Sequence, residues 1–126
     1  MLQNADVYPT LPAIDIKRAR KFYEETLGLK VVREDPSPGI QLKAANGTGL
    51  YIYQRGATKA DHTVASFTVK DVEAEVKELK AKGVKFEEYD MPEMGIKTVN
   101  GIATMDGMKG AWFKDTEGNI LGITSM

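Results

Sequence analysis

The chain contains no cysteine and a single histidine among its 126 residues. Without thiols it can form neither disulfides nor a thiolate metal site, which excludes a secreted disulfide-stabilised scaffold. No segment approaches the run of about 20 apolar residues that spans a membrane. The N-terminal stretch MLQNADVYPTLPAID lacks the basic start and the apolar run of a signal peptide. We therefore expect a cytoplasmic protein with no membrane partner.

The chain also lacks a large excess of charge of either sign, since its net charge is only -1. Such a balance leaves no basic footprint for nucleic acid, so we expect no nucleic-acid partner. The composition, 42% hydrophobic and 28% charged, is ordinary for a globular domain. A length of 126 residues favours one domain, 1–126.

The first half of the chain has a clear order of elements. It reads as a strand at 8–14, a helix at 15–28 and three strands near 29–34, 40–44 and 49–54. Pro9 and Pro12 favour an edge strand or an irregular one here, since each removes a ladder donor. Asp15 is a good helix N-cap and Gly28 a good helix end. The pair Asn46-Gly47 predicts a hairpin between the last two strands.

The second half repeats this order. It reads as a strand at 63–69, a helix at 71–83, a strand at 84–89, a hairpin around Asp106-Gly107 and a last strand at 119–125. The segment 90–100 reads as a plain connecting loop or as a flap over a cavity. The repeat predicts an α+β fold of two tandem βαβββ modules, about 7–54 and about 62–125. Together they would form a curved mixed sheet around a cavity, a natural place for a ligand.

Three stretches resemble a known family: DIKRARKFYEETLGL, VKDVEAEVKELKAKGV and the terminal FKDTEGNILGI. In this order they resemble the vicinal oxygen chelate superfamily, which includes glyoxalase I, extradiol dioxygenases and bleomycin-resistance proteins. The resemblance covers essentially the whole chain and implies paired βαβββ modules. Small members usually pair, so it also implies a homodimer. Catalytic members bind a divalent metal through His, Gln or Glu, and the metal acts as a Lewis acid on the substrate.

By this resemblance the metal-ligand positions fall on Tyr8, Val64 and Gly122, with a fourth near Leu50 to Ile52. None of them carries His, Gln or Glu. A metal site needs three or four donors that converge on one point. We therefore predict no metal and no cofactor, and favour binding over catalysis. The alternative is a metal-dependent or metal-free lyase, isomerase or dioxygenase-like enzyme of the same superfamily.

Aromatic and methionine side chains on the predicted strands suit a pocket for a flat, partly apolar molecule. Simple sheet packing is the alternative for each. His62 reads either as an imidazole at the mouth of the cavity, a weak catalytic candidate, or as a solvated strand start. The candidate ligand-binding residues are Tyr8, Tyr51, Tyr53, His62, Val64, Met105, Trp112 and Gly122.

These observations lead to one expected function. The protein binds a small aromatic or amphipathic molecule in the manner of the bleomycin-resistance branch, without a metal. A dimerisation module without a ligand is a further alternative. The acidic run over 87–93 is either a solvated edge or an attractor of cationic ligands. Gly122 is the main reason to favour ligand binding over catalysis, because it offers no metal donor and leaves room beside the last strand.

Overall fold

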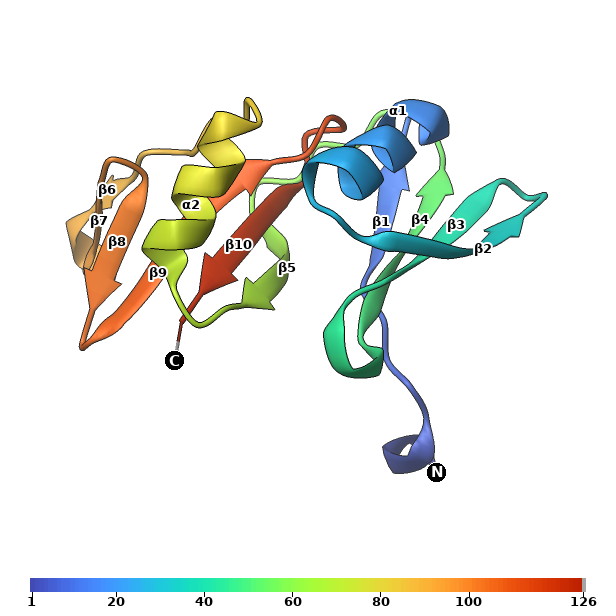
Figure 1. The fold of residues 1–126 in the computed structure, drawn as a ribbon, viewed down its shortest axis with the longest axis horizontal. Helices are drawn as coiled ribbons and strands as arrows, with labels where there is room; N and C mark the ends of the chain where they lie inside the picture. Colours follow the sequence, from blue (N-terminus) through green and yellow to red (C-terminus); the bar gives the residue numbers. More distant parts are fainter. Residues whose placement is uncertain (126) are drawn as a thin grey trace. The chain divides into compact units, whose positions relative to one another are not determined.

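The structure is a computed structural model, and it describes residues 1–125. The chain divides into two compact units, Met1–Thr58 and Lys59–Met126. Each unit contains one mixed β-sheet and one principal helix, as Figure 1 shows. The predicted α+β class is therefore confirmed. No helix among the described residues is long and apolar enough to cross a membrane.

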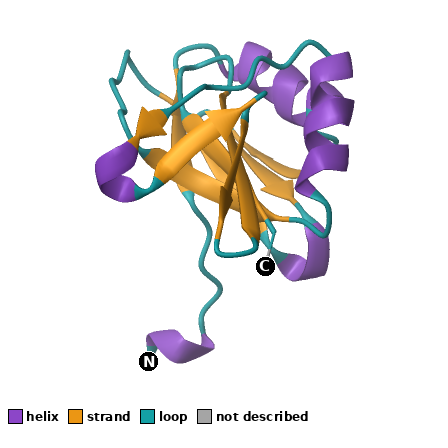
Figure 2. Cartoon of the chain, turned by 90° about the vertical axis from the view of Figure 1, so that its left-hand side faces the viewer, coloured by secondary structure: helices purple, strands orange, loops and turns teal. Residues whose placement is uncertain are grey.

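The first unit is built on a four-stranded sheet with the strand order β1-β4-β3-β2. Its strands are β1 (Thr10–Ala13), β2 (Lys30–Asp35), β3 (Gly39–Lys43) and β4 (Gly49–Gln54). β1 is parallel to β4, while the other neighbours are antiparallel. β1 lies at the edge of the sheet, as its prolines predict. A short 3-10 turn, Leu2–Asn4, stands away from these strands (Figure 2).

The helix of the first unit, α1 (Ile16–Lys21), begins at the predicted cap. The Asp15 carboxylate accepts a hydrogen bond from the Arg18 backbone N–H at 3.1 Å. From Phe22 to Thr26 the helix continues as a wider π-helical turn, in which the Leu27 N–H bonds the Phe22 carbonyl. The sequence predicts one uninterrupted helix here, and periodicity alone does not distinguish the two kinds of turn.

α1 covers one face of its sheet. Arg20 on α1 forms an ion pair with Glu34 on β2, and Glu34 is the cross-strand partner of Ile40. Side chains alternate between the faces of a strand, so Ile40 and its partner Ile52 also face α1. The core of this unit consists of Leu11, Ala13, Ala19, Tyr23, Ile40, Leu42, Leu50 and Ile52, all of them at most 4% exposed.

The second unit is built on a six-stranded sheet with the order β5-β10-β9-β8-β7-β6. Its strands are β5 (Thr63–Thr68), β6 (Asp90–Met91), β7 (Ile96–Val99), β8 (Ile102–Met105), β9 (Met108–Lys114) and β10 (Ile120–Thr124). β5 and β10 are parallel, and the other pairs are antiparallel. The predicted hairpin between β8 and β9 is confirmed, with Asp106 at the positive φ of 48° that such a turn requires.

The helix of the second unit, α2 (Val72–Ala81), lies along β9 and β10 in Figure 1. The Asp71 carboxylate caps it by accepting from the Ala74 N–H at 3.1 Å. Glu73 of α2 forms an ion pair with Lys109 of β9, which identifies the face of the sheet that α2 covers. The core here contains Val72, Val76, Leu79, Ala111, Phe113, Leu121 and Ile123.

Two predictions for the second unit are wrong. The expected strand at 84–89 contains only one isolated bridge, between Phe86 and Phe113. The expected loop or flap at 90–100 is instead β6, a 3-10 turn at Pro92–Met94, and β7. These strands extend the sheet by pairing with each other and with β8. Pro92 and Gly95 lie in the tight turn between these two short strands.

Candidate functional site

The face of the first sheet that α1 does not cover, called here its open face, carries a set of polar and aromatic side chains. β2 contains an irregularity between Val31 and Arg33. Because of it, Arg33 lies on the opposite face from Val31 and on the same face as its cross-strand partner Gln41. Gln41 is in turn the partner of Tyr51 on β4, and Tyr53 lies two residues further along. Tyr51 and Tyr53 therefore face away from α1, while Leu50 and Ile52 pack toward it.

A groove of about 660 Å³ lies at one end of this open face. Tyr8 is part of its wall, and its hydroxyl donates to the Gly47 carbonyl at 3.4 Å. The groove therefore includes Tyr8, the residue at which the family resemblance predicts the first metal-ligand position. Its lining residues are Asp6, Tyr8, Val32, Arg33, Gln41, Leu42, Lys43, Asn46, Gly47 and Thr48.

Beside the groove, three side chains form a hydrogen-bonded cluster. The Tyr51 hydroxyl donates to Asp35 Oδ2 at 2.7 Å. Arg33 Nε donates to Asp35 Oδ1 at 3.1 Å and Arg33 Nη2 to Oδ2 at 3.3 Å. The guanidinium carbon lies 5.9 Å from the centre of the Tyr51 ring. The orientation of Arg33 is therefore set by a two-point contact, and its Nη1 group has no acceptor among the described residues.

The cluster shifts the protonation equilibria of its members in opposite directions. The hydrogen bond from Tyr51, and then the one from Arg33, holds the pKa of Asp35 below its ordinary value of 3.8. The same Asp35 carboxylate raises the pKa of Tyr51 above its ordinary value of 10.0, and loss of solvent adds to this shift. At neutral pH the cluster thus contains a carboxylate and a protonated phenol, the forms that its hydrogen bonds require.

The Tyr51 side chain occupies the space beside Gly39 where a side chain would otherwise lie. A Cβ at residue 39 would lie 2.6 Å from Tyr51 Cζ and closer still to the hydroxyl oxygen. Real Cβ atoms are essentially never found so near another heavy atom. Glycine is therefore required here for the close approach of the ring.

The second unit also presents aromatic side chains on the face that α2 does not cover. Trp112 lies on this face because it alternates with Ala111 and Phe113, and its ring centre is 5.5 Å from that of Tyr89 at an interplanar angle of 68°. Gly122 is the cross-strand partner of Trp112. Met105 faces the same side and pairs with Met108.

The space beside Gly122 is not empty. A Cβ at this position would lie 3.0 Å from Ser66 Oγ and 3.5 Å from Thr63 Cγ2. Side chains from β5 thus take up much of the room that a side chain at 122 would need. Of the two remaining candidates, Val64 is a half-buried residue of β5, and His62 lies just before this strand, with its side chain 72% exposed and 3.5 Å from Asp61.

The donor set does not fit the metal that the family resemblance implies. The Tyr8 hydroxyl is a poor neutral ligand, and Val64 and Gly122 have no donor side chain. Among residues 1–125 no group of three or more His, Cys, Asp or Glu side chains is placed to hold a metal ion. No chemical step through a metal is derived for these residues.

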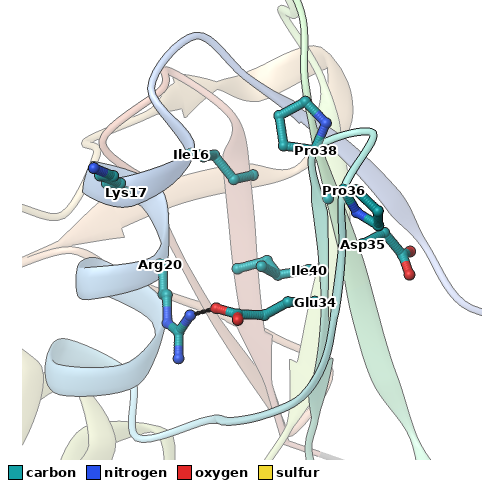
Figure 3. Close-up of a pocket in the computed structure, with 9 residues that line it drawn as sticks. Ile16, Lys17, Arg20, Glu34, Asp35, Pro36, Pro38 and Ile40 are labelled. Carbon is teal, nitrogen blue, oxygen red and sulfur yellow. Dashed lines mark ion pairs between the residues drawn. The ribbon is translucent and has the colours of Figure 1, made fainter.

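A second pocket, of about 510 Å³, lies on the other side of the first sheet, between α1 and the β2–β3 turn. Figure 3 shows Ile16 and Ile40 approaching each other across it, with the Arg20–Glu34 ion pair at one end. Asp35 is directed away from this pocket. Both acidic partners of Arg20, Glu24 and Glu34, are bound to it, so its charge is already neutralised.

Sequence reasoning missed the polar half of the first open face, namely Arg33, Asp35, Gly39, Gln41 and Lys43. Strict alternation does place Arg33 and Asp35 on one side of β2. The irregularity beside Val32 is not visible in the sequence, and it decides which side that is.

The chain belongs to the Glyoxalase/Bleomycin resistance protein/Dioxygenase superfamily, whose family model matches residues 7–123. A comparison with curated proteins found no match.

Solved structures support the same fold. TnmS3, an antibiotic binding protein from Streptomyces sp. CB03234, has a TM-score of 0.69 and 20% identity, covering 97% of this chain and 97% of that one. Lactoylglutathione lyase from Agrobacterium tumefaciens has a TM-score of 0.71 and 18% identity, covering 97% and 93%. The fosfomycin resistance protein FosX from Listeria monocytogenes has a TM-score of 0.69 and 14% identity, covering 98% and 91%. At these identities the likeness concerns the fold alone.

Proposed function

We propose that this protein binds a small aromatic or amphipathic molecule, without a metal, against the open face of its first sheet. The groove that contains Tyr8 carries the proposal. It is large enough for a small organic molecule, and its wall combines aromatic, aliphatic and hydrogen-bonding groups. Val32, which is 51% exposed, supplies apolar surface opposite a polar side that includes Gln41.

The chemistry of the side chains supports binding over metal-dependent catalysis. The three matched metal-ligand positions offer no imidazole and no carboxylate. The one histidine is largely solvent-exposed, with its ring nitrogen 3.5 Å from the Asp61 carboxylate. On the open face, the Tyr51 hydroxyl is engaged with Asp35.

The proposal is tested by ligand-detected NMR with a panel of planar aromatic compounds, run with and without EDTA. We expect binding of some members of the panel with unchanged affinity in EDTA. Tyr8→Ala should weaken this binding, because it removes an aromatic wall of the groove. Val99→Ala is the matched control, since Val99 is a 65% exposed residue in the other unit.

Two results would contradict the proposal. Tight stoichiometric binding of Ni²⁺, Zn²⁺, Mn²⁺ or Fe²⁺ by tag-free protein would refute the metal-free site. Equal loss of binding in both variants would show that the compounds do not use the groove. A homodimer and a cytoplasmic location remain part of the proposal, and light scattering of the purified chain tests the first of these.

A further inference from the structure

The open face of the first sheet carries more positive charge than its own carboxylates neutralise. Lys30 and Lys43 are direct cross-strand partners on β2 and β3. Two like charges in this arrangement repel each other and destabilise the strand pair. Neither lysine has an ion pair among residues 1–125. A bound anion would relieve this repulsion.

Arg33 brings a third cation to the same face. It is the partner of Gln41, two residues from Lys43, and such diagonal positions lie about 7–8 Å apart, within reach of long side chains. Asp35 holds Nε and Nη2 of Arg33, which lines the groove, and Nη1 has no hydrogen-bond partner among residues 1–125. The carboxylates on this side are Asp35, which is already engaged, and Asp6 in the groove wall. Over the open face as a whole, three cations thus meet two carboxylates, an excess of one positive charge; Lys30 lies beside the groove, as the cross-strand partner of Lys43 in its wall.

We propose that the ligand of this groove is a small organic acid, with one carboxylate on an apolar body. This inference rests on the proposed function and names the chemical class of its ligand. The carboxylate lies between Lys43 and Arg33 Nη1, where two cationic donors meet it. The apolar body lies against Tyr8 and Val32. A carboxylate matches the single excess charge, whereas a phosphate group carries about -1.5 to -2 at neutral pH.

The acid class is tested with three probes that share one ring system: 2-naphthoate, 2-naphthamide and 2-naphthylmethylamine. Each is titrated into the isotope-labelled full chain, and backbone amide signals are followed by NMR. We expect 2-naphthoate to shift the signals of β2 and β3 and to bind about tenfold more tightly than the amide, because charged hydrogen bonds are about twice as strong as neutral ones. This advantage should shrink as salt is added.

Substitutions locate the carboxylate. Lys43→Gln should weaken 2-naphthoate binding about fivefold to tenfold while changing 2-naphthamide binding little, since it removes one charged donor. Lys30→Gln has a more specific signature. It should raise the melting temperature of the free protein, because it relieves the lysine repulsion, and yet weaken 2-naphthoate binding. Lys21→Gln is the control, as Lys21 is exposed on α1 and removes the same charge elsewhere.

The possible failures are distinguishable. If the amide or the amine binds this groove as tightly as 2-naphthoate, the acid class is overturned while ligand binding stands. If no probe shifts the β2 and β3 signals, but planar compounds bind elsewhere, the groove itself is overturned. If Lys21→Gln weakens 2-naphthoate as much as Lys43→Gln does, the effect comes from net charge, and the carboxylate site is refuted.

Discussion

Replacing Gly39 by alanine tests whether the β2–β3 hairpin and Tyr51 are fitted to each other. The added Cβ would lie 2.6 Å from Tyr51 Cζ, too close for a carbon–carbon contact. The neighbouring atoms belong to a rigid ring whose hydroxyl is bonded to Asp35 at 2.7 Å. The ring must therefore move, and its hydrogen bond is lost or lengthened.

The size of the effect follows from two opposed contributions. Forcing an extra carbon into a packed site costs about 1–3 kcal/mol. Alanine also restricts the unfolded chain, which returns about 0.4–1 kcal/mol. We expect Gly39→Ala to destabilise the protein by about 1–2 kcal/mol. Gly56→Ala is the matched control, because nothing lies within 4 Å of a Cβ at residue 56. It should leave the stability unchanged or raise it by less than about 1 kcal/mol.

Urea unfolding measures both stabilities, and NMR of ¹³C-labelled tyrosine follows the titration of the Tyr51 ring. In the parent protein the pKa of Tyr51 lies above its ordinary value of 10.0 because of Asp35. In Gly39→Ala it should fall toward that value. A variant that is as stable as the parent and keeps the raised pKa would refute the fit between the hairpin and the ring.

Three further substitutions have defined outcomes. Asp71→Ala removes the carboxylate that caps the Ala74 N–H, and should cost about 1 kcal/mol in urea unfolding, with Asp71→Ser restoring most of it. Tyr51→Phe should raise the pKa of Asp35 toward 3.8, measured by carboxyl NMR. Because the pKa of Asp35 is lowered in the folded state, ionised Asp35 stabilises the fold above pH 3.8, and this contribution is lost as the pH falls through the folded-state pKa. Tyr51→Phe should therefore reduce the amount of stability that the protein loses on acidification. Leu121→Ala, at a fully buried position, should cost about 2–5 kcal/mol in the same unfolding assay.

The fold was predictable where local chemistry and global pattern agree. Asp15 and Asp71 cap their helices because a carboxylate there satisfies a free N–H, and this can be read from single residues. Pro12 favoured an edge or irregular position for the first strand, and β1 lies at the edge of its sheet. The segment 84–99 was mispredicted because β6 pairs with β7 and β7 pairs with β8, and hydrophobic periodicity along the sequence does not reveal such pairing.

The candidate site was only half predictable for a related reason. An aromatic residue type by itself indicates a possible pocket, so Tyr8 could be predicted as a ligand-binding candidate from the sequence. Arg33 and Lys43 look like ordinary surface charges until the register of β2 against β3 brings them to one face. That register depends on an irregularity of one residue, and such a slip reverses the face of every side chain beyond it.

The last prediction concerns the space beside Gly122, which has no side chain of its own. Read from the sequence alone, it predicts vacant space at a position where the family resemblance implies a metal ligand. The Ser66 hydroxyl lies 3.0 Å from where a Cβ would stand, so alanine at 122 requires a small movement of that side chain. Gly122→Ala should therefore destabilise the protein by a few tenths of a kcal/mol up to about 1 kcal/mol, and Ser66→Gly should remove most of this cost. Urea unfolding measures both effects. If Gly122→Ala stabilises the protein that retains Ser66, the space beside residue 122 is open, and the sequence-based prediction of a vacant position is correct.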